Sequence, residues 1–145
     1  MSSLILSTAT RVLVPLILAL SAFIFVQGHN EPGGGFVGGL LAATAFALLE
    51  KAEGLERARR ALRVPPLSIA AVGLGCALVS GLWGGLADGH FLQAVWPFVT
   101  VDAEGKHGLP LGSVMLFDLG VYLVVFGSVC AILFALEQAV AGEER

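Results

Sequence analysis

Asp118 is the residue whose type and position could most readily do chemistry, because it interrupts an apolar segment between Leu111 and Leu136. A carboxylate inside a membrane is costly unless it is protonated, paired or hydrated. Two roles therefore stay open for Asp118. It could exchange a proton or a cation on a transport path, or it could be a structural residue near a helix start, hydrogen-bonded to a neighbouring protein of the same assembly.

His29 and Glu31 are two further ionisable candidates, placed at the boundary of an apolar segment. Histidine titrates near neutral pH, so His29 could relay protons, although a structural hydrogen-bonding role is the commoner one. Glu31 could attract cations or simply be solvated, and solvation is favoured. One histidine beside one carboxylate is a weak metal pattern, and His90 and His107 lie too far along the chain to strengthen it. No metal or other cofactor is expected.

A hinge rich in glycine carries these two residues and separates two apolar segments. Its first half cannot be helical, because Pro32 biases the preceding residue toward an extended conformation. Its second half can be a helix in which glycines recur at a spacing of four and let another helix approach closely. We expect packing roles for the residues of this motif: Pro32, Gly33, Gly34, Gly35, Phe36, Gly38 and Gly39.

The composition predicts an all-α integral membrane protein that forms one domain over residues 1–145. Of its 145 residues, 57% are hydrophobic and 13% charged, whereas soluble domains carry about 25% charged residues. Cys76 and Cys130 both fall in apolar runs, which gives no disulfide framework. No nucleotide-binding or catalytic motif and no basic stripe for nucleic acid is present. These absences argue against an enzyme.

Four segments are long enough, at about 20 apolar residues, to cross the hydrocarbon core of a bilayer. The predicted bundle of spans covers residues 7–26, 34–50, 65–87 and 111–136. A frayed acidic tail is expected from Glu137 onward. The basic loop at 51–64 favours a short surface helix that is solvated, with an anionic-lipid site as the alternative. In the connection at 88–110, the apolar part at 91–101 is expected at the membrane interface or against a partner, with a charged turn at 102–108.

The distribution of basic residues predicts the topology. With four spans, Arg11, the basic loop and Arg145 share one side, and Lys106 alone lies on the other. Basic residues are retained on the cytoplasmic side of membranes. Both termini are therefore expected in the cytoplasm, with the glycine hinge facing outward.

Two of these stretches resemble one known family. Residues 28–40 (GHNEPGGGFVGGL) are similar to the signature of the MrpB, or MnhB, family, and residues 117–127 (FDLGVYLVVFG) resemble its last helix. The resemblance covers essentially the whole chain in motif order. It implies a hetero-oligomer of several different proteins in the plasma membrane of a prokaryote. That complex, the Mrp antiporter, exchanges Na⁺ or other monovalent cations for protons.

The resemblance implies that the chain is a small membrane component that packs beside the other Mrp antiporter subunits and helps to form the cation path. It assigns no residue as an ion ligand. The alternative is a non-transport scaffold in a related hydrogenase or respiratory complex, and the neighbouring genes would discriminate between the two.

Overall fold

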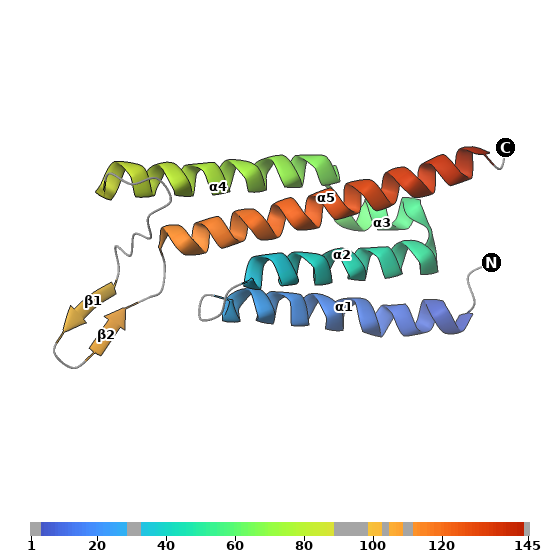
Figure 1. The fold of residues 1–145 in the computed structure, drawn as a ribbon. Helices are drawn as coiled ribbons and strands as arrows, with labels where there is room; N and C mark the ends of the chain where they lie inside the picture. The colour runs from blue at the N-terminus through green and yellow to red at the C-terminus, as the bar shows by residue number, and fades with distance from the viewer. Residues whose placement is uncertain (1–3, 29–32, 89–98, 103–104, 109–111, 144–145) are drawn as a thin grey trace.

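The computed structural model describes residues 4–28, 33–88, 99–102, 105–108 and 112–143. This part of the chain contains helices and one β-hairpin (Figure 1). In chain order the elements are α1 (Leu4–Gln27), α2 (Gly34–Glu53), α3 (Leu55–Leu62), α4 (Pro66–Asp88), β1 (Val99–Asp102), β2 (Gly105–Gly108) and α5 (Ser113–Glu143).

The four predicted spans are confirmed as α1, α2, α4 and α5, which are long and apolar enough to cross a membrane. Helix α1 has 24 residues, so it is about 36 Å long, more than the roughly 30 Å of a hydrocarbon core. It continues through Pro15 without ending there. Helix α2 starts at Gly34, directly after Gly33 with its positive φ of 99°, as the proline and glycine pattern of the hinge predicts.

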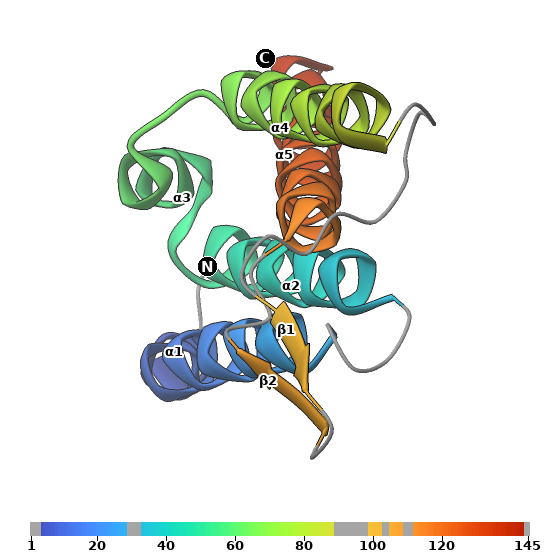
Figure 2. The same ribbon diagram turned by 90° about the vertical axis from the view of Figure 1, so that its left-hand side faces the viewer.

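The four long helices lie side by side in a row. They do not gather around a common centre, which is the arrangement that the word bundle usually describes. The order across the row is α1, α2, α5, α4, as the end-on view shows (Figure 2). The main contacts join α1 to α2, α2 to α5 and α5 to α4, and α1 barely touches α5. A row leaves two broad apolar faces uncovered, so none of the four long helices is surrounded on all sides by the others.

Small residues set the contact between α4 and α5. A Cβ added to Gly73 would lie 2.7 Å from the carbonyl oxygen of Gly120, and one added to Gly127 would lie 2.5 Å from the amide nitrogen of Ala70. Ser80 also donates a short hydrogen bond to the carbonyl oxygen of Ser113. These small residues therefore let the backbones of α4 and α5 approach closely.

The enclosed core is small and lies between α2 and α5. Ala42, Ala43 and Cys130 are at most 2% exposed, and Phe126 packs beside them. The rings of Phe46 and Phe126 lie 5.4 Å apart. By contrast, only 11% of the apolar window of α1 is buried, against 44% for α2. Most apolar surface of the outer helices is thus left for lipid or for other proteins.

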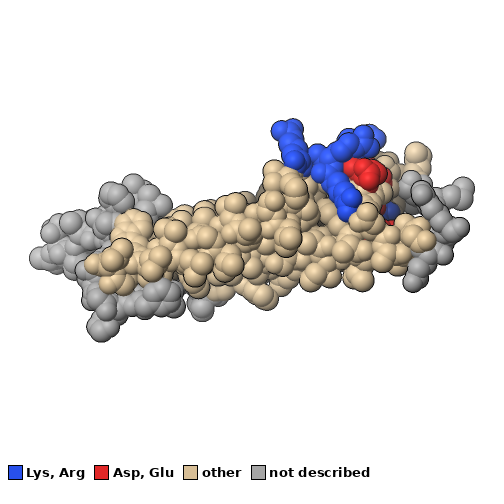
Figure 3. Space-filling view, turned by 90° about the horizontal axis from the view of Figure 1, so that it is seen from above, with Lys and Arg blue, Asp and Glu red and all other residues tan. Residues whose placement is uncertain are grey.

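Charged side chains gather at one end of the row, where α1 begins and α5 ends (Figure 3). The predicted surface helix is present there as α3, which buries Ala58 and exposes its arginines. The predicted frayed tail is wrong, because α5 continues to Glu143. Glu137 and Gln138 are held instead by Lys51 and Arg59.

The connection before α5 contains a hairpin that the sequence reading did not predict. Strands β1 and β2 pair antiparallel, with Val99 opposite Gly108 and Asp102 opposite Gly105. The charged turn expected at 102–108 is wrong over most of its length, because β2 occupies 105–108. The run Val99, Thr100, Val101 has the β-branched residues that favour strands, so the signal was present.

Replacing Gly73 by valine should separate α4 from α5 and lower the free energy of unfolding by about 1–3 kcal/mol, as overpacking does. Gly75→Val on the same helix is the matched control, because a Cβ there meets nothing within 4 Å. The thermal midpoint of the purified protein in detergent measures both. Equal midpoints for the two variants would contradict the close contact.

Candidate functional site

Asp118 lies where α5 passes the beginning of α2. Its Oδ1 accepts a hydrogen bond from the backbone amide of Gly35 at 2.9 Å. The first amides of a helix have no partner inside that helix, and Gly33 supplies no side chain to cap them. A carboxylate is also favoured by the positive end of the helix dipole. Asp118 therefore acts as a cap for α2, contributed by a helix far along the sequence.

This contact requires glycine at position 35. A Cβ built there would clash with the backbone oxygen and the carboxyl group of Asp118. Gly34 meets Gly28 at the end of α1 in the same way, and Gly39 meets the backbone of Tyr122 and the side chain of Val125. The glycines of the motif thus face both neighbouring helices.

One turn further along, a hydroxyl pair joins three helices. Ser21 on α1 is fully buried, and its Oγ donates to the carbonyl oxygen of Gly38 on α2 at 2.7 Å. The hydroxyl of Tyr122 on α5 lies 2.8 Å from the same Oγ. Because the Ser21 proton is directed at Gly38, Tyr122 is the donor in that second bond. The Tyr122 ring also packs edge-on against Phe25, with centroids 5.3 Å apart.

These residues form one polar site, which we call the three-helix junction: Ser21, Gly35, Gly38, Asp118 and Tyr122. Asp118 and Tyr122 are four residues apart on α5, so they lie on the same face of that helix. Asp118 is half-buried within this chain. Within the described residues, its polar partner is thus a backbone amide of its own chain.

The other predicted site residues are placed as follows. His29, Glu31 and Pro32 lie outside the described residues. Phe36 is 52% exposed within this chain. In the parts of the chain that the structure describes, no group of three or more His, Cys, Asp or Glu is gathered as a metal ion would require.

A second polar cluster was missed by sequence reasoning. Glu50 near the end of α2 has a side chain only 3% exposed and lies 3.5 Å from Lys51 Nζ. Lys51 in turn donates to Glu137 Oε2 on α5 at 2.6 Å. Glu50 follows Gly39 by eleven residues, which is about three helical turns, so the two residues lie on the same face of α2. Because the glycines on that face pack against neighbouring helices, their position would have indicated that Glu50 is buried.

The fold and this site define a class: a multi-pass helical membrane protein with a polar contact among its helices and large uncovered apolar faces, built to pack against partners. A family described as "Domain related to MnhB subunit of Na+/H+ antiporter" matches residues 5–131. The chain belongs to this family.

Individual relatives agree with this assignment. The protein named as the B subunit of the Na(+)/H(+) antiporter of Bacillus subtilis (strain 168) is 37% identical over 143 residues, covering 99% of this chain and 96% of the relative. The same-named protein of Alkalihalophilus pseudofirmus is 33% identical over 137 residues, covering 94% of each.

Two further matches are to parts of much longer chains. The protein named as the A/B subunit of a probable K(+)/H(+) antiporter in Rhizobium meliloti is 35% identical over 87% of this chain but only 12% of its own length. A chain in the structure of the Mrp complex from Dietzia sp. DQ12-45-1b matches with a TM-score of 0.73 and 35% identity. That match covers 92% of this chain and 14% of the other.

A double-mutant cycle on Ser21→Ala and Tyr122→Phe should show coupling of about 0.5–1.5 kcal/mol, since each variant removes one partner of the same hydrogen bond. Thermal midpoints of the two single variants and the double variant measure it. A control cycle combines Tyr122→Phe with Ser68→Ala, on the exposed surface of α4. The stability changes of these two substitutions should be additive. Additive losses at Ser21 and Tyr122 would mean that their hydroxyls are not bonded.

Proposed function

We propose that the chain works as the B subunit of a Na⁺/H⁺ antiporter of the Mrp type, a complex of several different proteins. The observation that carries this proposal is the match, along nearly its full length, to proteins named as antiporter B subunits. The chain contributes to assembly and borders the path of Na⁺, or another monovalent cation, and protons through the complex. It is a transporter component and not an enzyme. The same names favour an antiporter over a hydrogenase scaffold.

The row of helices supports a role inside a larger assembly. Large apolar side chains are exposed on every long helix, among them Leu16, Phe23, Leu74 and Ile132. Lipid and other antiporter subunits are the partners that can cover such faces without the cost of contact with water. In two relatives the corresponding domain is part of a chain about seven to eight times longer, which supports close packing against a large partner.

Asp118 holds α2 in place in this proposal and does not carry the ion. Its carboxylate already accepts the Gly35 amide at the beginning of α2. No second ionisable side chain of the described residues pairs with it. A proton carrier would need a series of ionisable partners at the same depth. The placement of Asp118 thus favours the structural hypothesis over the transport hypothesis.

Asp118→Asn should therefore retain most antiport activity, because the amide oxygen can still accept the Gly35 hydrogen bond. Asp118→Leu should lose this chain from the purified complex, since it leaves the Gly35 amide unpaired at about 1–3 kcal/mol. Glu56→Gln, on the exposed face of α3, is the control for loss of a carboxylate. Cation-induced proton release from everted vesicles and the content of this chain are measured on the same preparation.

Loss of exchange in a fully assembled Asp118→Asn complex would overturn the structural role. It would place the carboxylate on the ion path. Retention of exchange and assembly in Asp118→Leu would show that neither role is needed.

The end of the row that carries α3 faces the cytoplasm of a prokaryotic cell in this proposal. Five basic residues lie on α3 or close to it in the chain: Lys51, Arg57, Arg59, Arg60 and Arg63. The basic patch lies toward the end of the row where α1 begins and α5 ends (Figure 3). Basic residues flanking membrane spans favour the cytoplasmic side. Both termini then lie in the cytoplasm, and the three-helix junction lies toward the outer face of the plasma membrane.

Single cysteines at Arg60 and at Asn30 test this orientation in a background without Cys76 and Cys130. An impermeant thiol reagent applied to intact cells should label position 30 and leave position 60 unlabelled. Labelling of both positions after the cells are broken controls for accessibility. Strong labelling of position 60 alone in intact cells would reverse the topology.

A further inference from the structure

A groove of about 470 Å³ lies where α3, the beginning of α4 and the last third of α5 meet. Its lining includes two arginines, Arg59 and Arg63, and most of the other residues that line it are apolar. The apolar wall includes Leu62, Leu67, Ala135 and Phe134. The antiporter role proposed above assigns nothing to this groove.

The positive charge in the groove is not neutralised within the described residues. Arg57 pairs with Glu53 at 3.1 Å and lines a neighbouring hollow, which Arg59 and Arg60 also line. Arg59 donates only to the neutral amide oxygen of Gln138, at 3.0 Å. Arg60 donates to the carbonyl oxygen of Glu56, and Arg63 has no acidic partner among the described residues.

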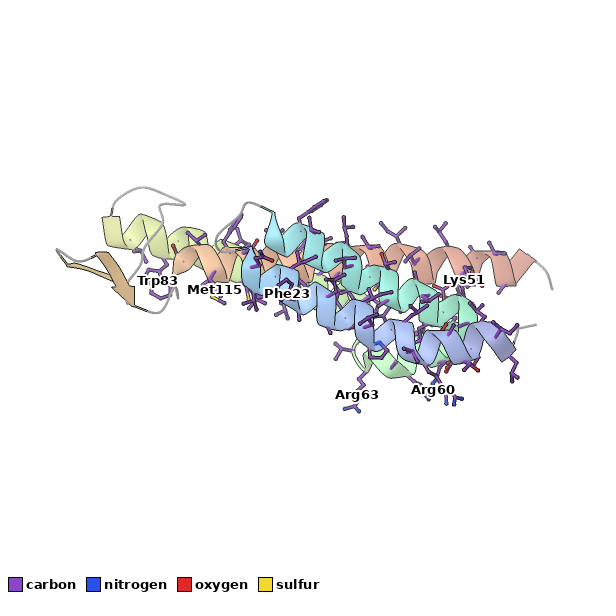
Figure 4. The ribbon with its side chains drawn as sticks, turned by 90° about the horizontal axis from the view of Figure 1, so that it is seen from below. Phe23, Lys51, Arg60, Arg63, Trp83 and Met115 are labelled. Atoms are coloured by element: carbon purple, nitrogen blue, oxygen red, sulfur yellow. The ribbon has the colours of Figure 1, made fainter. Side chains whose placement is uncertain are left out.

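Arg63, which lines the groove, lies at an unusual turn of the backbone. Arg63 ends α3 with a left-handed φ of 64°, the only positive φ of a residue other than glycine in the described chain. This turn redirects the chain into Pro65 and Pro66 at the start of α4. Arg60 and Arg63 point away from the helix row in the stick view (Figure 4).

The apolar wall of the groove continues onto the surface of the membrane-spanning helices. Leu67, in the first turn of α4, is 71% exposed, and Val64 beside it is 48% exposed. Phe134 of α5 closes the floor at 2% exposure. A ligand that fills the groove therefore meets two arginines and apolar side chains that continue onto the exposed surface of α4.

We propose that this groove binds an anionic phospholipid, with its phosphate on Arg59 and Arg63 and an acyl chain along Leu67 and Phe134. Guanidinium groups bind phosphate oxygens through paired, charge-assisted hydrogen bonds. Basic clusters next to a membrane span attract acidic lipids on the cytoplasmic leaflet. A free phosphate ion would leave the apolar wall unused, and a zwitterionic lipid would leave part of the arginine charge uncompensated. The inference rests on the proposed membrane placement but not on antiport activity.

The test uses the intact complex, purified in detergent and given phosphatidylglycerol with a photoreactive acyl chain. After irradiation, digestion and mass spectrometry should find the lipid attached to peptides that contain Leu67 or Phe134 of this chain. Unlabelled phosphatidylglycerol should compete, whereas phosphatidylcholine should do so about tenfold less effectively. Inorganic phosphate should not compete.

Arg59→Gln together with Arg63→Gln should lower attachment about tenfold at a subsaturating lipid concentration. Arg57→Gln, which removes an arginine already paired with Glu53, is the matched control and should change attachment by less than about twofold. If the double variant does not assemble, the lipid competition in the unaltered complex still decides the question.

Equal competition by phosphatidylcholine would reduce the groove to ordinary lipid contact and overturn the proposal. Competition by inorganic phosphate would make it a site for a soluble anion. Absence of attachment in an intact complex would mean that a neighbouring protein segment fills the groove. Antiport measured on the same preparations separates the two proposals, since normal exchange without lipid attachment contradicts only the lipid site.

Discussion

The hydrogen bond from the Gly35 amide to the Asp118 carboxylate is the constraint on which the row of helices depends. It joins α2 to α5, the two central helices, at the point where α2 begins. Here the chain must emerge from a glycine hinge in which Gly33 offers no side-chain cap. A carboxylate placed there by another helix satisfies the open amide and complements the helix dipole at the same time. It also requires a bare backbone at position 35, because any side chain would displace the acid.

The remaining helix contacts follow the same rule of close approach and local hydrogen bonding. Ser21 links α1 to Gly38 and Tyr122, and Ser80 links α4 to Ser113. In lipid, apolar side chains gain little from meeting one another, so close backbone packing and such polar contacts stabilise the association of helices. Each helix in the row packs mainly against one or two long neighbours, and the wide faces stay apolar. A row of helices of this form is suited to packing between other membrane proteins.

The two ends of the row differ in kind. One end holds the three-helix junction, built from uncharged groups and a single capped carboxylate. The other holds the arginines of α3 and the cluster of Glu50, Lys51 and Glu137. Glu50, which is 5% exposed, is more deeply buried than the half-buried Asp118 of the junction. The junction therefore fixes the geometry of the helices, whereas the charged end holds the ion pairs that join α2 to α5 and to α3.

The sequence by itself determined the class of protein, the four spans and the position at which α2 begins. These features depend on the length of apolar runs and on the local backbone preferences of proline and glycine, which act over a few residues. Only the tertiary structure decided that Asp118 meets Gly35, 83 residues away, and that Ser21 meets Tyr122, 101 residues away. It also decided the burial of Glu50, the extension of α5 beyond Glu137 and the order of the row. A helix with apolar residues on every side does not reveal from its own sequence which face meets which neighbour. That choice is made where small residues and hydrogen-bonding groups on separate helices coincide.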